Sequence, residues 1–338
     1  MNKYLKIFIS IAVSALFLWL AFKEVEFSEV VEASKEMSWG WITPFAVLTL
    51  FSHYIRAERW RMLFNDGGVV PHRSTLFTGV MFGYLGNIVF PRLGEITRPI
   101  YVARQVGESN SKLIGTIVLE RIVDVVSMFV IALLVGIFLV SDVEVLSRLF
   151  AVDLTDPQIL ASILKDLAFY GVIALVIGVG LFFLLRKLSQ GSGAFPDFVK
   201  KVRETAKSFF VGVLSIRKLK NWPLFVFYTA VIWLAYITMT YIPFWMFDMQ
   251  GQFDLSYADA VVLTMVSAVG IAIPTPGGVG SYHYFVMYSL FILYAVPEAT
   301  GLAFATIAHA ATVVIVVITS PILLALEKYL SLKRESKE

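Results

Sequence analysis

Two arginines and a glutamate interrupt an apolar segment near residue 90, where a proline and a glycine also break the helical pattern. Arg92, Glu95 and Arg98 lie in the stretch GNIVFPRLGEITR, inside a hydrophobic region that spans residues 74–102. A helix that restarts after such a break presents free backbone N–H groups and the positive end of its dipole. Arginine binds phosphate through two parallel N–H donors. These residues therefore predict an anion site of the phosphate-binding type, in which Glu95 and Arg98 are close enough to pair.

A second source of positive charge is the stretch HYIRAERWR, which puts Arg56 and Arg59 on one face of an expected helix. They can extend the same basic site, or they can reach toward the membrane surface as long basic side chains commonly do. The complete expected phosphate-binding set is Arg92, Arg98, Glu95, Asn87, Arg56 and Arg59.

Three more charges lie inside an apolar helix, in the sequence LERIVDVV. Glu120 and Asp124 are four residues apart and share a face, and Arg121 lies three residues before Asp124. Each such charge costs about 3 kcal/mol at the centre of a membrane helix. We expect them to form an intramembrane charge network by pairing with Arg92 or Arg98, with proton relay as a second hypothesis.

A second broken apolar segment spans residues 257–296. Its break carries no charge, and its turn is rich in proline and glycine, which predicts close backbone approach to a ligand or to the first break. His283 can bind or titrate there, although a lone histidine is more often structural. The residues assigned to this second break are Pro274, Pro276, Gly277, Gly278, Gly280 and His283.

Composition sets the class of protein around these sites. Hydrophobic residues make up 58% of the 338 residues, charged residues only 16%, and the mean hydropathy is +0.78. A helix needs about 20 apolar residues to cross a bilayer, and the chain has several such runs. We therefore expect an all-α polytopic membrane protein with about six spanning helices and two broken re-entrant hairpins arranged as an inverted repeat.

The expected organisation has three parts. The first repeat half covers residues 1–140, with two spanning helices, the re-entrant hairpin 74–102 and a third spanning helix. A connector, 141–221, holds the spanning helix 159–185 of the second half and a basic amphipathic helix, 195–219. The rest of the second half, 222–338, has a spanning helix, the re-entrant hairpin 257–296, a last spanning helix and a short tail. The expected spans are 4–22, 41–64, 113–140, 159–185, 222–247 and 302–326.

The basic residues indicate an orientation. With both termini in the cytoplasm, 23 of the 28 lysines and arginines fall on the cytoplasmic side, as the positive-inside rule requires. Arg104 is interpreted as only marking that side. We expect a multi-pass protein of the cytoplasmic (inner) membrane, N-in and C-in.

The two breaks are related in sequence. An offset of 183 residues aligns GNIVFPRLGEI with VGIAIPTPGGV and matches Pro91 with Pro274, Gly94 with Gly277 and Ile88 with Ile271. Each half has an odd number of spanning helices, so the second half is inverted. Inverted repeats whose broken helices meet near the midplane are a recurring transporter design.

Several functional classes lack support. The chain has no cysteine, no Walker A loop, no His-Glu-x-x-His and no Gly-x-Ser-x-Gly. We expect no cofactor, no metal and no nucleic-acid partner. His53 and His309 are single histidines in apolar helices, to which the sequence assigns no role.

Three motifs together carry a family resemblance. N-x-x-x-P-R-x-G-E-x-x-R at 87–98, L-E-R-x-x-D at 119–124 and P-x-P-G-G-x-G at 274–280 resemble the lysylphosphatidylglycerol synthase transmembrane-region family. That resemblance covers most of the chain and implies translocation of a phospholipid or polyprenyl-phosphate-linked lipid between leaflets. The family often has an acidic residue soon after the last motif, where this chain has Ser281-Tyr282-His283. We expect no soluble aminoacyl-transferring domain of the kind the synthases carry, so the resemblance does not imply lysyl transfer.

The resulting functional hypothesis is a lipid flippase or transporter rather than an enzyme. Its expected partners are a lipid with a phosphate headgroup, the bilayer itself and a lipid-modifying enzyme encoded elsewhere. One alternative is a membrane-embedded lipid-phosphate enzyme similar to the polyprenyl-diphosphate phosphatases, whose Pro-Gly-x-Ser-Arg-Ser motif has no arginine counterpart at 276–281. Another is an accessory subunit of a glycosyltransferase.

Overall fold

The computed structural model describes residues 3–138 apart from 24, 36 and 65–68, isolated residues between 156 and 180, and residues 204–335 apart from 206. Throughout these described parts the regular elements are helices, as expected. The expected span 159–185 and the beginning of the amphipathic helix 195–219 lie largely outside the described residues. The end of the amphipathic segment is helical, and its last residues form a 3-10 turn.

The described helices of the first half follow one another closely. They are α1 (Lys3–Phe22), α2 (Phe27–Lys35), η1 (Trp39–Trp41), α3 (Ile42–Arg61), α4 (Arg73–Val89), α5 (Gly94–Val106) and α6 (Asn110–Phe138). Those of the second half are η2 (Leu214–Lys218), α10 (Trp222–Met246), α11 (Met249–Phe253), α12 (Tyr257–Ala272), η3 (Pro276–Gly278), α13 (Ser281–Tyr294) and α14 (Glu298–Glu335).

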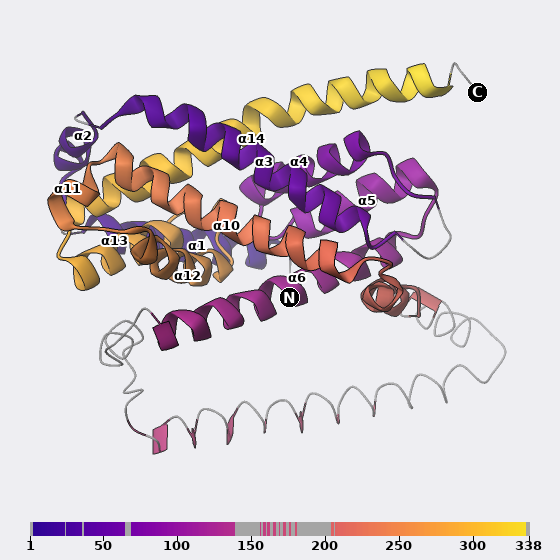
Figure 1. The fold of residues 1–338 in the computed structure, drawn as a ribbon, viewed down its shortest axis with the longest axis horizontal. Coiled ribbons are helices and arrows are strands. Elements are labelled where there is room, and N and C mark those ends of the chain that lie inside the picture. The colour runs from indigo at the N-terminus through magenta and orange to yellow at the C-terminus, as the bar shows by residue number, and fades with distance from the viewer. Residues whose placement is uncertain are drawn as a thin grey trace.

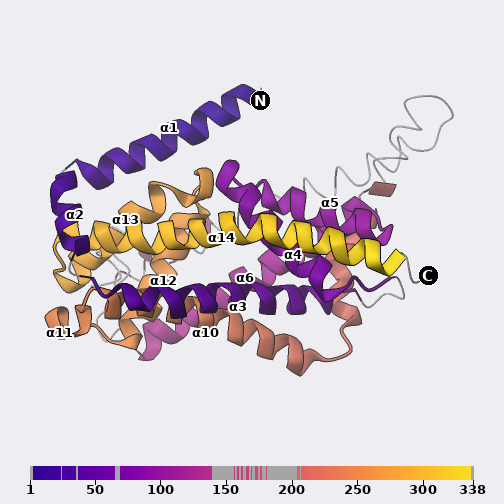
Figure 2. The same ribbon diagram turned by 90° about the horizontal axis from the view of Figure 1, so that it is seen from above.

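The long helices lie along the long axis of the molecule (Figures 1 and 2). Helices α2 and α11 mark one end, and the C-terminus marks the other. The hairpin α4–α5 occupies the end with the C-terminus, whereas α12–α13 occupies the opposite end. The turn of the second hairpin, η3, packs against α4. The two hairpins therefore enter the bundle from opposite ends, and their turns meet inside it.

Helices α3 and α4 have counterparts in the second half. The 183-residue offset carries α3 onto residues 225–244, within α10, and carries α4 onto residues 256–272, which α12 matches almost residue for residue. Corresponding helices run in opposite directions, because α3 leads away from the end marked by α2 and α10 returns toward it.

Two of the described helices are long and apolar enough to cross a bilayer, at Trp222–Met246 and Glu298–Arg334. α14 extends well beyond the expected span 302–326, because the sequence continues in helical pattern past its apolar part. Helices α3 and α6 cover most of the expected spans 41–64 and 113–140, and buried charges interrupt their apolar character.

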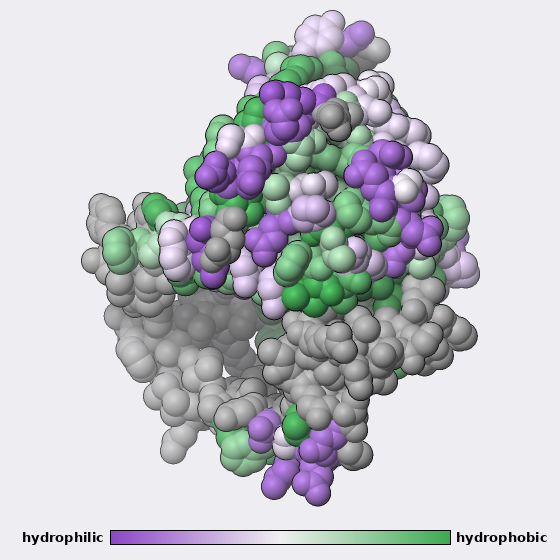
Figure 3. All heavy atoms as spheres, turned by 90° about the vertical axis from the view of Figure 1, so that its left-hand side faces the viewer, coloured by the Kyte–Doolittle hydropathy of each residue, from purple (hydrophilic) through white to green (hydrophobic). Residues whose placement is uncertain are grey.

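The surface has the polarity of a protein surrounded by hydrocarbon. Large apolar side chains such as Phe227 on α10 and Ile322 on α14 are exposed, while Arg59 and Glu120 are almost completely buried. Figure 3 looks at the end that carries α2 and α11 and shows several hydrophilic clusters there among hydrophobic residues. Soluble domains show the reverse arrangement, since they rarely bury charges and rarely expose wide apolar surfaces.

Candidate functional site: a buried charge cluster

The first hairpin turn is built from a helix end, a cap and a glycine. α4 ends at Val89 and α5 begins at Gly94, whose N–H donates to Asn87 Oδ1 at 2.7 Å. A Cβ on Gly94 would lie 1.9 Å from the Gly83 carbonyl oxygen. Only glycine allows this approach of α5 to α4, which brings Arg98 directly against Gly83.

Seven charged residues from three helices form what we call the charge cluster. They are Arg56 and Arg59 from α3, Glu95 and Arg98 from α5, and Glu120, Arg121 and Asp124 from α6. The sequence separated these groups by up to 68 positions, and the fold brings all of them together.

Asp124 joins α6 to α3. Its two carboxylate oxygens accept hydrogen bonds at 2.7 Å from Arg56 Nη2 and from Arg59 Nη2. Arg121 Nη1 lies 3.7 Å from the same carboxylate. Arg56 and Arg59 are therefore buried in the bundle, and the hypothesis that they reach the membrane surface is wrong. Their burial is tolerated because charge-assisted hydrogen bonds offset part of the desolvation cost.

Glu120 joins α6 to α5. Arg98 Nη1 lies 2.9 Å from Glu120 Oε2, and Arg59 Nη2 lies 3.4 Å from Glu120 Oε1. The Arg98 guanidinium also covers the Trp60 ring at 4.0 Å, a cation–π arrangement that fixes its plane. The sequence predicted that Arg98 pairs with an acidic residue of the third spanning helix, which is α6, and the contact with Glu120 confirms this.

The expected contact between Glu95 and Arg98 is not the one that forms. Glu95 Oε1 instead lies 3.3 Å from Arg121 Nε, and both side chains are partly exposed. Because α5 packs against α6, Glu95 and Arg98 each meet an opposite charge of α6 rather than each other.

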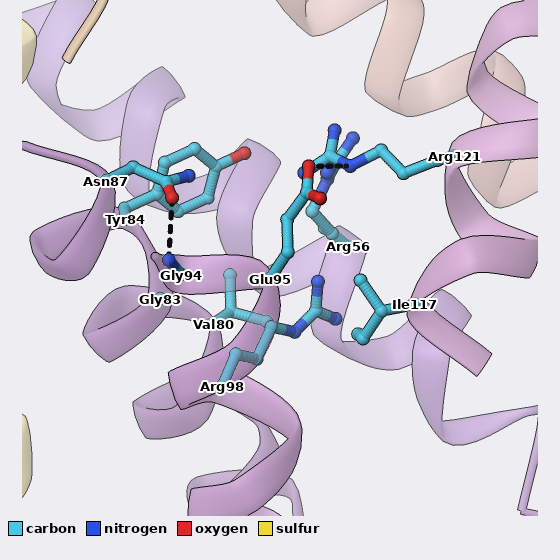
Figure 4. Close-up of a pocket in the computed structure, with 10 residues that line it drawn as sticks. All are labelled: Arg56, Val80, Gly83, Tyr84, Asn87, Gly94, Glu95, Arg98, Ile117 and Arg121. Atoms are coloured by element: carbon cyan, nitrogen blue, oxygen red, sulfur yellow. Dashed lines mark hydrogen bonds and ion pairs between the residues drawn. The ribbon is translucent and has the colours of Figure 1, made fainter. Parts of the chain in front are cut away.

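A small cavity lies inside the cluster (Figure 4). Its volume is about 20 Å³, which is enough for about one water molecule. Arg56, Arg98 and Arg121 converge on it together with Glu95. Arg98 Nη2 is buried and has no hydrogen-bond partner among the described residues. The complete lining is Arg56, Val80, Gly83, Tyr84, Asn87, Gly94, Glu95, Arg98, Ile117 and Arg121.

The structure separates Arg92 from this cavity. Arg92 is exposed, adopts a left-handed backbone conformation with φ 59°, and donates through Nη2 to the Ala272 carbonyl oxygen at 3.2 Å. Ala272 is the last residue of α12. Arg92 therefore connects the two hairpin turns. The cavity is lined by Arg98, Arg56, Glu95 and Asn87. Arg59 does not line it but pairs with Glu120 and Asp124 of the same cluster.

The second turn contributes no cavity-lining residue among those described. Gly277, with φ 61°, lies against Ile88 of the first hairpin, which confirms the expected approach of the two breaks. Gly280 packs on α1, where a Cβ would lie 2.5 Å from the Ser14 carbonyl oxygen. The remaining members of the second set, Pro274, Pro276 and Gly278, shape the turn itself.

His283 has a structural contact in this turn. Its Nδ1 accepts from the Gly280 N–H at 3.3 Å, and its ring lies 5.0 Å from that of His309. His309 Nε2 in turn lies 3.0 Å from the Gly277 carbonyl oxygen. The two histidines therefore provide hydrogen-bond partners for backbone polar groups of the irregular turn. Such groups need partners at membrane depth.

Sequence reasoning did not identify Tyr84 or Trp60. Tyr84 lines the cavity and places its hydroxyl 3.4 Å from that of Tyr236, and Trp60 supports Arg98. Tyr84 lies one turn before Asn87 on the same face, and Trp60 lies one turn after Arg56. Because each of them lies three or four positions from a predicted site residue on the same helix, helical spacing could have identified both.

Replacing Asp124 with asparagine is expected to destabilise the protein by about 3–5 kcal/mol, because it removes the counter-charge of the buried Arg56 and leaves the buried Arg59 only the longer contact with Glu120. Thermal unfolding of the purified protein in detergent measures this effect. The control is Glu32→Gln, which removes a carboxylate from an exposed pair with Lys35 and should change stability by less than about 1 kcal/mol. Equal melting temperatures for both variants would contradict the buried network.

The fold and the site together define a helical membrane domain, with apolar side chains on its flanks and a charged site in its interior. The chain belongs to the family described as the lysylphosphatidylglycerol synthase TM region, whose model matches residues 7–320. Membership gives the protein a membrane location and a function related to membrane lipid. No curated protein matches the sequence.

Proposed function

We propose that this protein is a transporter that moves a lipid with an anionic phosphate headgroup between the leaflets of the membrane. The observation that carries the proposal is Arg98. Its guanidinium is buried beside a cavity at a hairpin turn, and its Nη2 has no hydrogen-bond partner among the described residues. A phosphate oxygen is a natural acceptor for such a group.

The charge of the cluster supports an anionic ligand. Four arginines face three carboxylates, so one positive charge is left in excess. An uncompensated charge at membrane depth is costly, and such charges commonly mark substrate pathways. A headgroup with one negative charge would neutralise the excess.

The arrangement of the hairpins supports transport across the membrane. In our proposal the hairpins α4–α5 and α12–α13 are re-entrant and enter from opposite sides of an inner membrane, with both termini in the cytoplasm. Their turns meet at Arg92 and Gly277, so a ligand near this junction could be reached from either side. Irregular backbone is tolerated at this depth only where protein or a wet cavity surrounds it.

The same cavity favours transport over hydrolysis. Apart from the Tyr84 phenol and the Glu95 carboxylate, which is paired with Arg121, its described lining contains no group that could act as a nucleophile. Attack on a phosphate ester needs an activated nucleophile and a nearby base. We therefore propose binding and release of the headgroup without chemistry.

Entry of a headgroup requires the site to open, because the cavity holds only about one water molecule. The contacts that close it on one side are the ion pairs between α5 and α6, Arg98 with Glu120 and Arg121 with Glu95. A phosphate can replace the carboxylates as the partner of both arginines. We propose that this exchange loosens α5 from α6 and admits the headgroup.

Reconstituted vesicles test the proposal. The purified protein should accelerate the movement of fluorescent phosphatidylglycerol between leaflets, measured by chemical quenching of the outer leaflet, well above the protein-free rate. Fluorescent phosphatidylcholine, whose headgroup has no net charge, should move more slowly. If neither lipid moves faster than in empty vesicles, the transport proposal is wrong.

A further inference from the structure

His53 is a buried histidine that is not a member of the charge cluster. It lies on α3 one turn before Arg56, and only 3% of its surface is exposed. Neither Nδ1 nor Nε2 has a hydrogen-bond partner among the described residues. A buried polar group without a partner is costly, and native proteins keep few of them.

The surroundings of His53 connect it to the cavity. Its ring stacks on Tyr84 at 4.0 Å between centroids, and Tyr84 lines the cavity. Tyr84 also places its hydroxyl 3.4 Å from that of Tyr236 on α10. His53 is thus separated from the anion site by a single aromatic side chain.

The charged groups that act on His53 are cations. Arg56 on its own helix and Arg98 on α5 are the charges that influence it, while Tyr84 of α4 stacks on its ring and Tyr236 of α10 contacts the Tyr84 hydroxyl. The nearby carboxylates Glu120 and Asp124 are held by the arginines. α14 also packs on α3, but its His309 contacts the second turn instead.

We propose that His53 binds a proton when an anionic headgroup occupies the cavity, so that lipid and proton cross the membrane together. In the empty site, burial of the ring and then the two arginines oppose a positive charge on the imidazole. An anion removes the opposition that comes from the arginines, because it neutralises the one excess charge of the cluster. The proton then moves from water on the acidic side to a free ring nitrogen of His53, which becomes an imidazolium.

This coupling is reciprocal, because if the anion favours the proton, the proton favours the anion to the same degree. One negative headgroup and one proton together carry no net charge. The transport step would therefore respond to a pH gradient and not to the membrane potential. This inference rests on the proposed function and adds its driving force.

The test uses vesicles containing the wild-type protein and fluorescent phosphatidylglycerol, with potassium and valinomycin holding the membrane potential at zero. With the outside more acidic by one pH unit, the lipid should accumulate in the inner leaflet by about tenfold, the ratio that one proton per lipid permits. A potassium diffusion potential at equal pH should leave the distribution even. A pH dye inside the vesicles should report proton entry with the lipid.

His53→Asn removes the titrating group while keeping a polar side chain of similar shape. This variant should still move the lipid but distribute it evenly under the same gradient. His72→Gln, which changes an exposed histidine before α4, should behave as wild type. If His53→Asn does not fold, the wild-type dye signal and the response to potential still decide the question.

Two results would overturn the inference: a wild-type distribution that follows the potential and ignores the pH gradient, or a His53→Asn variant that keeps the tenfold ratio. A wild-type protein that moves no lipid under any condition would instead overturn the proposed function. The two failures are therefore distinguishable.

Discussion

Arg98→Gln is expected to reduce transport of fluorescent phosphatidylglycerol in reconstituted vesicles by roughly 30-fold or more. Arg98 is a buried donor at the cavity whose Nη2 has no hydrogen-bond partner in the described part of the chain, and it also neutralises Glu120. Truncating one partner of a buried charge pair costs about 2–5 kcal/mol, and each 1.4 kcal/mol is about tenfold. The substitution therefore removes the anion-binding group and shifts the cavity toward negative charge.

Two further variants separate binding from folding. Arg104→Gln changes an exposed arginine two helical turns away on α5 and should transport at the wild-type rate. Arg98→Lys keeps the charge but loses the planar fork and its stacking on Trp60, so it should retain only part of the activity. If Arg98→Gln inserts, purifies as a single species and transports like Arg104→Gln, the anion site lies elsewhere.

Gly94→Ala is expected to disrupt the first hairpin, with a loss of about 3 kcal/mol or more in stability. Its Cβ would lie 1.9 Å from the Gly83 carbonyl oxygen and 2.8 Å from Asn87 Oδ1. The nearest obstacle is backbone, so α5 must move away from α4. That movement would shift Glu95 and Arg98 together and open the cavity, so transport should fall as well.

Gly40→Ala is the matched control, because a Cβ at Gly40 meets no atom within 4 Å. Thermal unfolding in detergent should give a clearly lower melting temperature for Gly94→Ala than for Gly40→Ala, and size-exclusion chromatography should show a smaller folded fraction. Equal stability of the two variants would mean that α4 and α5 do not approach each other as closely as described.

Much of the site was accessible from the sequence, because membrane helices carry charge at a known cost. The position of Arg98, Glu120 and Asp124 in otherwise apolar segments predicted that they belong to a charged site. The proline and glycine pattern predicted the breaks near 91–94 and 274–278, where the helices do end. The pairing of partners was harder to predict, since Glu95 meets Arg121 on another helix rather than Arg98 on its own.

The sequence by itself determined the helical membrane class, the two breaks, the 183-residue correspondence of the halves and the family. These features depend on local composition and spacing, which a single chain displays. Only the tertiary structure decided that Arg56 and Arg59 are buried, that Arg92 bridges the two turns while Arg98 faces the cavity, and that His53 lies next to that cavity. Such outcomes depend on which helix faces which, and packing between distant segments sets that choice.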